Sequence, residues 1–237
     1  MGPRTDISAF PLAPPPDADD PRTVAAHDWN AFVDVEQMIN HWDRPGWSAA
    51  TRRYYWMITF PGEDPLIEHA RGCQRAIEPL GFDPIPGSGL HMTLLRIGDT
   101  SHVPPATIDQ LAATAHREVP RAFTIHAIPL TASRGAIRYS VAPWTPILAL
   151  HAALSRAGEC HDIPTARSTH LLRPHIGIAY CNRPMPTASV RDAVAPLRAL
   201  TSIPLKVSHV RLVELRRDSR RYQWTIHHEV SLASSDT

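Results

Sequence analysis

The sequence predicts an α+β protein made of two similar halves. Predicted helices alternate with predicted strands, and five elements recur in one order at a shift of about 83 to 84 residues. The chain closes with a predicted pair of adjacent strands, which favours antiparallel pairing over a doubly wound parallel sheet. We therefore expect a bilobal, pseudo-twofold fold in which two antiparallel-sheet lobes with outer helices surround a central groove.

The N-terminal part of the chain is predicted to lie outside these halves. Residues 1–24 are rich in proline and lack periodic apolar positions, which predicts a disordered tail. Over 25–51, apolar residues recur at spacings of three and four before Pro45-Gly46, which predicts a helical extension. The apolar positions of this extension are Phe32, Val35, Met38, Ile39 and Trp42.

The first repeat, about 52–130, opens a domain predicted over 52–237. A run rich in β-branched and aromatic residues starts at Tyr54. Pro65 then stands at the first position of a helix that Gly81 terminates. The predicted elements are strands at 54–60, 90–97 and 122–129 and helices at 64–80 and 107–119.

The second repeat, about 135–232, shows the same order. Thr145 and Pro146 begin its first helix, and Pro196 must kink or end its second helix. Strict alternation of apolar and polar residues from Arg221 onward predicts a terminal hairpin. The predicted elements are strands at 136–142, 171–180, 206–216 and 221–232 and helices at 145–158 and 188–200.

The composition narrows the class of protein. With 237 residues, of which 43% are hydrophobic and 20% charged, the chain can bury a substantial core. No apolar stretch is long enough to span a membrane, and the N-terminus lacks a signal-peptide pattern. Three widely spaced cysteines fit a reducing cytoplasm. A net charge of +1 argues against a surface that coats nucleic acid, so we expect a cytoplasmic monomer with at most a local basic groove.

The third element of each repeat carries a histidine followed by a small residue. His91 and Thr93 share one face of the first of these strands, and His175 and Gly177 share one face of the second, because strand side chains alternate. Bulky apolar residues fill the opposite face in both copies. Two such histidines at equivalent points of a duplication are expected to meet in one shared groove.

This paired motif resembles that of the 2H phosphoesterase superfamily, in its 2′-5′ RNA ligase-like (LigT-like) branch. The family is marked by two His-x-Thr/Ser-hydrophobic motifs roughly eighty residues apart on a pseudo-symmetric fold. The likeness covers about 52–232 and includes Arg173-Pro174-His175 and a tyrosine, Tyr222, in the closing hairpin. One departure is Gly177, which stands where the family usually has a threonine or serine.

The resemblance implies acid–base chemistry at an RNA end or nucleotide, with no metal and no cofactor. A neutral imidazole would take a proton from an attacking water or hydroxyl, and an imidazolium would protonate the leaving ribose oxygen. The implied reaction is opening of a 2′,3′-cyclic phosphate, or formation or cleavage of a 2′-5′ phosphodiester. We favour His175 as the base and His91 as the acid, while the pseudo-symmetry leaves the reverse assignment open.

Further residues are candidates for holding the substrate. Thr93, the backbone at Gly177 and three arginines, Arg96, Arg138 and Arg173, are candidates for binding the phosphate oxygens. Tyr180, Tyr222 and Trp224 are candidates for stacking on a base, with core packing as an equal alternative.

Two other functions remain open at the level of sequence. The loss of a hydroxyl at Gly177 is compatible with a non-catalytic protein that binds RNA or nucleotides on the same scaffold. A phosphodiesterase of small cyclic nucleotides or signalling oligonucleotides would use the same histidines in a groove of different shape. A metal site is not expected, because His27-Asp28 and His161-Asp162 lack accompanying ligands at suitable spacing.

Overall fold

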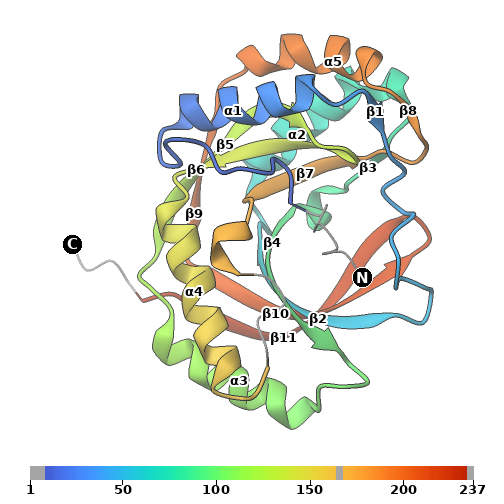
Figure 1. The fold of residues 1–237 in the computed structure, drawn as a ribbon. Coiled ribbons are helices and arrows are strands. Elements are labelled where there is room, and N and C mark those ends of the chain that lie inside the picture. Colours follow the sequence, from blue (N-terminus) through green and yellow to red (C-terminus); the bar gives the residue numbers. More distant parts are fainter. Residues whose placement is uncertain (1–8, 164–167, 234–237) are drawn as a thin grey trace, which may run out of the picture.

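The structure, a computed structural model, describes residues 9–163 and 168–233. Over these residues two large antiparallel sheets form the centre of the molecule, and helices cover them on the outside (Figure 1). This arrangement confirms the predicted α+β class with two antiparallel-sheet lobes. None of the helices in the described ranges is long and apolar enough to cross a membrane.

The first sheet has the strand order β11-β10-β2-β4, and the second sheet has the order β3-β7-β6-β5-β9. The first sheet consists of β2 (Arg52–Thr59), β4 (His91–Asp99), β10 (His209–Asp218) and β11 (Arg221–Ser231). The second sheet consists of β3 (Asp83–Pro84), β5 (Phe123–Ala132), β6 (Ala136–Ala142), β7 (His175–Tyr180) and β9 (Ile203–Val207). A short pair, β1 (Gln37–Met38) and β8 (Met185–Pro186), lies beside them.

The two repeats exchange strands, so neither repeat forms a lobe alone. β5 belongs to the first repeat but pairs with β6 and β9 in the second sheet, and β10 belongs to the second repeat but pairs with β2 in the first sheet. The strand predicted over 206–216 is therefore two strands that separate at Ser208. The lobes expected at 52–130 and 135–232 are wrong in this respect, because pairing partners distant in sequence leave no trace in local periodicity.

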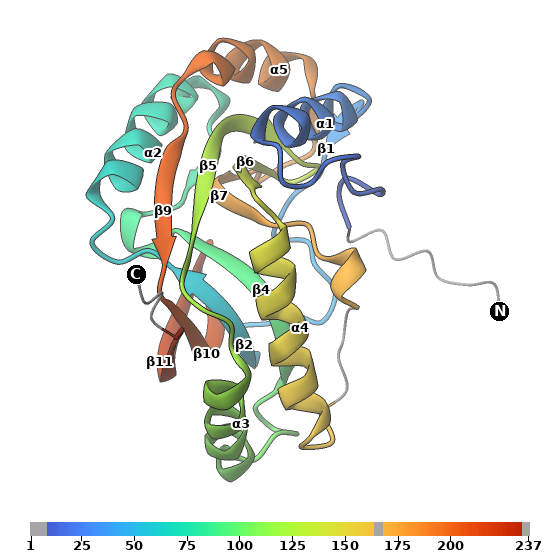
Figure 2. The same ribbon diagram turned by 90° about the vertical axis from the view of Figure 1, so that its left-hand side faces the viewer.

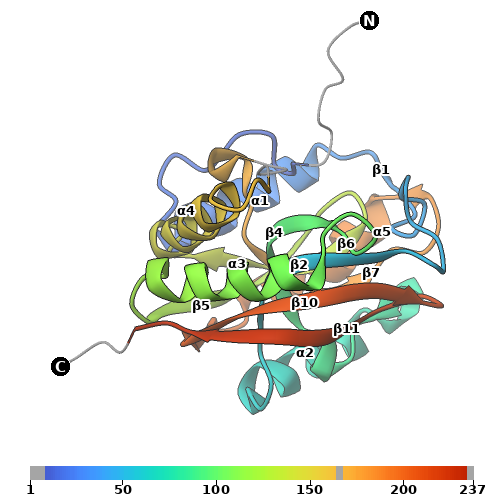
Figure 3. The same ribbon diagram turned by 90° about the horizontal axis from the view of Figure 1, so that it is seen from below.

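Helices cover both sheets. Two helices cover opposite faces of the second sheet, as Figure 2 shows. α2 (Asp64–Ala76) packs against β7 on one face, and α1 (Pro21–Val33) packs along β5 and β6 on the other. α5 (Ala188–Val194) ends just before Pro196 and continues as a 3-10 turn from Ala195. Pro196 was predicted to kink or end this helix. In the first sheet, α3 (Pro105–Glu118) lies along β11 and α4 (Thr145–Glu159) lies against β4 (Figure 3).

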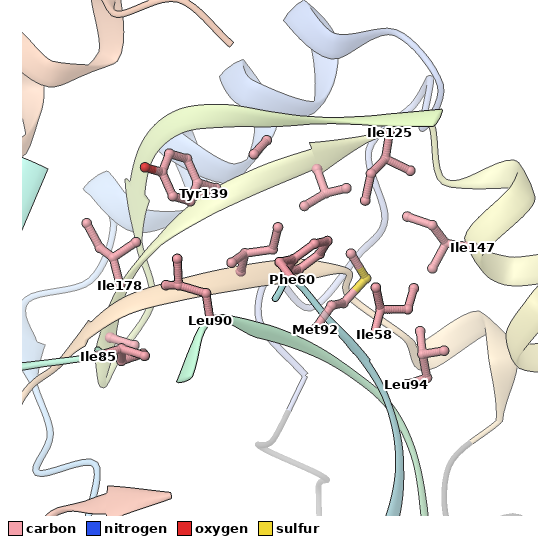
Figure 4. Packing of buried hydrophobic residues seen from close by; sticks show 14 of the residues in the cluster. Ile58, Phe60, Ile85, Leu90, Met92, Leu94, Ile125, Tyr139, Ile147 and Ile178 are labelled. Carbon is pink, nitrogen blue, oxygen red and sulfur yellow. The ribbon is translucent and has the colours of Figure 1, made fainter. Parts of the chain in front are cut away.

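The core lies between the inner faces of the two sheets. Met92 and Leu94 on β4 are buried, and so is Ile178 on β7 (Figure 4). Ile176 on β7 is buried as well. Burial of each such side chain contributes about 1.5 to 3 kcal/mol. Since side chains alternate along a strand, this packing turns the opposite faces of β4 and β7, which carry the histidines, away from the core.

The N-terminal region differs from the expectation of a tail followed by a helix over 25–51. The described part of 1–24 is ordered: Asp20 caps α1 by accepting a hydrogen bond from the Thr23 backbone at 2.7 Å, and Pro21 begins the helix. Asp19 likewise caps α4 through Thr145 at 2.8 Å. The proline-rich composition predicted disorder because it gave no sign of these distant partners. Residues 1–8 lie outside the described ranges.

The helix predicted around Val35, Met38 and Trp42 is also wrong. β1 pairs with β8, and the backbone amides of Ile39 and His41 donate to the carbonyls of Arg134 and Cys181, each at 2.7 Å. These bonds hold the segment extended along the second lobe. Its apolar spacing reflects separate contacts with that lobe rather than one helical face.

Candidate active site

The two predicted histidines are held by the same device in both strands. The Nδ1 atom of His91 lies 2.8 Å from the carbonyl oxygen of Gly89, and the Nδ1 atom of His175 lies 2.7 Å from that of Arg173. In each case the acceptor stands two residues before the histidine, in the turn that leads into the strand. A carbonyl can only accept, so each neutral ring carries its proton on Nδ1 and keeps the lone pair on Nε2 for chemistry.

The strands that carry the two rings lie next to each other. β4 and β7 approach each other where the two sheets meet (Figure 1). The pKa of His175 is lowered to about 3, chiefly because the surrounding protein desolvates the ring, and further by the charges of Arg138 and His91. Desolvation also lowers the pKa of His91, which the bond to Gly89 opposes. His175 is exposed and His91 is half-buried, so both rings remain accessible.

A tryptophan and two threonines lie around His91. The edge of its ring meets Trp224, with centroids 5.3 Å apart and planes at 68°. Thr59 lies opposite His91 on β2, and Thr93 shares the strand face of His91. Thr59 also accepts a hydrogen bond from Arg211, a basic residue that the sequence analysis did not select.

A third histidine, His41, lies beside the pair and was not among the predicted site residues. It stacks on Tyr180 with ring centroids 3.9 Å apart, and it meets Tyr222 edge-on. The pKa of His41 falls to about 2, first through burial and then through the charges of Arg44, Arg217 and both catalytic candidates. The segment that carries His41 thus lies at the edge of the site.

The three aromatic candidates differ in accessibility. Tyr180 is buried under His41, so its ring is covered on that side. Tyr222 and Trp224 are half-buried and lie on one face of β11. Of the three side chains, these two therefore present the surface that a base can reach.

The arginine candidates are also placed differently from one another. Arg138 is buried, lies 3.6 Å from Asp28 and donates to the Phe10 carbonyl. Arg173 donates to the carbonyls of Pro11 and Leu12. Both guanidinium groups therefore hold the N-terminal segment, although Arg138 still acts electrostatically on His175.

The remaining arginine candidate and two further arginines have other neighbours. Arg96 is exposed and pairs with Asp99 at 3.1 Å. Arg44 and Arg217, which sequence reasoning did not select, flank His41, and Arg217 lies over the rings of three neighbours at 4.8 to 5.5 Å, namely Trp42, Trp47 and Tyr222. The only signal for Arg217 was its place in the arginine- and aromatic-rich hairpin.

The position of Gly177 is partly filled by a neighbour. A Cβ atom there would lie 3.1 Å from Cδ1 of Ile85 and 3.9 Å from Cε1 of Tyr180. Ile85 thus occupies part of the space beside Gly177. The flexible end of the Ile85 side chain must shift slightly before a larger residue can replace Gly177.

Among the residues that the structure describes, the histidine pair belongs neither to a metal-binding cluster nor to the cavity beside Arg211. Within the described ranges, no group of three or more His, Cys, Asp or Glu side chains is arranged to hold a metal ion. A cavity of about 110 Å³ opens elsewhere, between Phe60, Lys206 and Arg211, and neither His91 nor His175 lines it.

Fold and motif together define a class of protein. A profile of the 2′-5′ RNA ligase superfamily matches residues 62–219, about two thirds of the chain. The chain therefore belongs to the 2′-5′ RNA ligase superfamily, within the 2H phosphoesterases. A search of curated proteins found no match.

Solved structures of similar fold agree with this assignment. E. coli LigT in its apo form shares 16% identity at a TM-score of 0.56, over 77% of this chain and 98% of LigT. The protein TT0787 of Thermus thermophilus shares 17% identity at a TM-score of 0.57, over 78% of this chain and 100% of TT0787. At such identities the likeness establishes the fold.

Proposed function

We propose that this protein is a metal-independent phosphoesterase that acts on RNA ends, with 2′,3′-cyclic phosphate phosphodiesterase or 2′-5′ RNA ligase-type activity. One observation carries the proposal: two imidazoles at equivalent points of a duplicated fold are oriented by equivalent backbone bonds, at 2.8 and 2.7 Å. A structural histidine needs no such matched partner, whereas in-line displacement at phosphorus needs one group on each side.

In the hydrolytic direction, water attacks the phosphorus of a 2′,3′-cyclic phosphate while its proton moves to Nε2 of the base. The bond from phosphorus to one ribose oxygen breaks, and the acid donates its Nε2 proton to that oxygen. The products are a phosphomonoester and a ribose hydroxyl, with the two histidines having exchanged proton states. Ligation of a ribose hydroxyl follows the same path, with that hydroxyl in place of water.

The electrostatics favour His175 as the base and His91 as the acid. Arg138 and Arg44 stand near His175 and disfavour its protonated form, whereas no cation of this kind lowers the pKa of His91. A base must be neutral before it accepts a proton, and an acid must start protonated. The negative charge of a bound phosphate would raise the pKa of both rings and so allow His91 to hold its proton near neutrality.

Thr93 supports the same reaction as a donor to a phosphate oxygen, because it lies on the face of β4 that carries His91. Structures of E. coli LigT with 3′-AMP and with phosphate are consistent with a nucleotide phosphate as ligand for the fold. For this chain we propose an RNA end or a nucleotide as substrate.

A second candidate function is non-catalytic binding of RNA ends. The observation that favours it is Gly177, where no hydroxyl is available and Ile85 narrows the space. Loss of one oxyanion donor costs about 10²- to 10³-fold in rate, which can reduce an enzyme to a binder.

Turnover separates the two functions. Purified protein is incubated in EDTA with oligonucleotides that end in a 2′,3′-cyclic phosphate, and the products are resolved by chromatography. We expect ring opening by the wild type and its loss in His91→Ala and in His175→Ala, with circular dichroism unchanged. Binding without product in the wild type, or normal rates in either variant, would reject the enzymatic proposal.

A further inference from the structure

The hydroxyl of Tyr222 has two hydrogen-bond partners within the protein. Nη2 of Arg217 donates to it at 3.1 Å, and Nε2 of His41 lies 3.3 Å away. An arginine can only donate, so the Arg217 bond uses a lone pair of the tyrosine oxygen. The direction of the second bond depends on which nitrogen of His41 carries the proton.

Arg44 settles that direction. Its Nη2 atom lies 3.3 Å from Nδ1 of His41, and since a guanidinium has no acceptor, Nδ1 must accept. The neutral His41 ring therefore carries its proton on Nε2 and donates it to Tyr222. The strongly lowered pKa of His41 keeps the ring neutral at physiological pH.

The tyrosine oxygen then has both lone pairs occupied and one proton left to give. Among the residues that the structure describes, no hydrogen bond accepts that proton. A phenol that has been turned into a pure donor is suited to an anion.

Tyr180 lies between Tyr222 and the position where the second motif lacks its hydroxyl. The ring of Tyr222 meets Tyr180 edge-on, with centroids 5.7 Å apart. Tyr180 in turn borders Gly177, with its Cε1 atom 3.9 Å from the place of a Cβ. Tyr180 therefore connects Gly177 to Tyr222 through two successive contacts.

We propose that the Tyr222 hydroxyl, oriented by His41 and Arg217, donates to a non-bridging phosphate oxygen and replaces the donor that Gly177 lacks. This proposal rests on the proposed function, since it places a phosphate between His91 and His175. Tyr222 becomes a catalytic residue through its oxygen rather than a base-stacking residue through its ring. His41 and Arg217 are positioning residues, because they act through Tyr222.

The test removes the oxygen and keeps the ring. Tyr222→Phe is compared with wild type for kcat and KM on the cyclic phosphate oligonucleotide and for the Kd of inorganic phosphate by calorimetry. We expect kcat to fall by about 10- to 100-fold, within the range for one lost oxyanion donor, and phosphate to bind more weakly. Tyr54→Phe serves as the matched control, because Tyr54 is buried on the other face of the same sheet.

A rescue variant makes the test specific for the missing donor. Gly177→Ser in the Tyr222→Phe background should recover part of the lost kcat, because it restores a hydroxyl on the same side. Unchanged kcat and phosphate affinity in Tyr222→Phe, while His91→Ala is inactive, would overturn this inference and leave the proposed function standing. If wild type shows no turnover, the proposed function fails, and unchanged phosphate affinity in Tyr222→Phe would then overturn the inference separately.

Discussion

The two histidine strands, β4 and β7, are alike in how they orient the ring and unlike in what surrounds it. Both bond Nδ1 to the carbonyl two residues earlier. Around His91 lie Thr93 and Trp224, whereas His175 faces cations and is followed by Gly177. Backbone geometry has thus been preserved in both copies, while side chains beyond the histidines have diverged.

This difference separates the features that the two halves share from those that only one half has. A carbonyl acceptor is supplied by the turn itself, so it persists whatever residue stands there. A side-chain hydroxyl depends on the residue itself, and the second strand has Gly177 where the first has Thr93. The two halves should therefore contribute unequally to the same reaction, and the following predictions test that inequality.

The largest difference should appear between His91→Gln and His175→Gln on a substrate with a nitrophenyl leaving group. Nitrophenolate needs no proton, so loss of the acid His91 should cost less than about tenfold. Loss of the base His175 should cost about 10²- to 10⁴-fold, the usual contribution of a general base. Release of nitrophenolate from a 2′-deoxynucleoside 3′-nitrophenyl phosphodiester, which has no 2′-hydroxyl and must be attacked by water, measures both rates.

His161→Gln is the control, because His161 bonds Thr114 on α3, away from both histidine strands. Equal losses in the two catalytic variants would show that the roles are shared, and the opposite order would exchange acid and base.

Thr93→Val should have the next largest effect. Valine keeps the shape and removes the hydroxyl, so we expect kcat to fall by about 10²- to 10³-fold if Thr93 is the donor on the β4 side. The melting temperature should stay close to that of the wild type, since Thr93 is only half-buried. A rate within threefold of the wild type would remove Thr93 from the site.

Gly177→Ser should change the rate less and in the opposite direction. A serine hydroxyl adds a donor, but its Cβ requires Ile85 to shift from 3.1 Å. We expect kcat to rise by up to about tenfold, a fraction of what a well-aimed donor supplies. Gly177→Ala introduces the same crowding without the hydroxyl, so a gain that alanine reproduces would refute the donor explanation.

The smallest effect concerns stability and the edge of the site. Folded His41 has a pKa of about 2, whereas a histidine in the unfolded chain titrates near 6.5. Below about pH 6.5 the unfolded state therefore binds a proton at His41 that the folded state does not bind. As a result, the free energy of unfolding falls as the pH falls, by about 1 kcal/mol per pH unit.

His41→Gln should reduce this slope between pH 6.5 and 5, measured by urea denaturation at each pH. His228→Gln is a suitable comparison, because His228 is paired with Asp109 at the surface. An unchanged slope in His41→Gln would mean that His41 is protonated in the folded protein.

The sequence predicted the strands and both histidines because these depend on local pattern. Alternation placed His91 and Thr93 on one face, and the burial of Met92 and Leu94 agrees with it. Pro196 also ended its helix near the predicted residue.

The strand exchange and the partners of His41 were not predicted because they depend on contacts between distant residues. His41 meets Tyr180 and Tyr222 only after the chain has folded, and no spacing in the sequence links them. Arg173 was expected to hold phosphate, yet it binds carbonyls of Pro11 and Leu12. Local patterns predict elements and motifs, whereas the partners of an arginine are set by the tertiary fold.

The most direct test of the central claim is a crystal structure with a 3′-phosphorylated nucleotide at neutral pH. The account predicts that Nε2 of His91 and Nε2 of His175 each lie about 2.6 to 3.2 Å from different oxygens of one phosphate group. A phosphate that contacts only one of these rings, or that binds away from both, would contradict it.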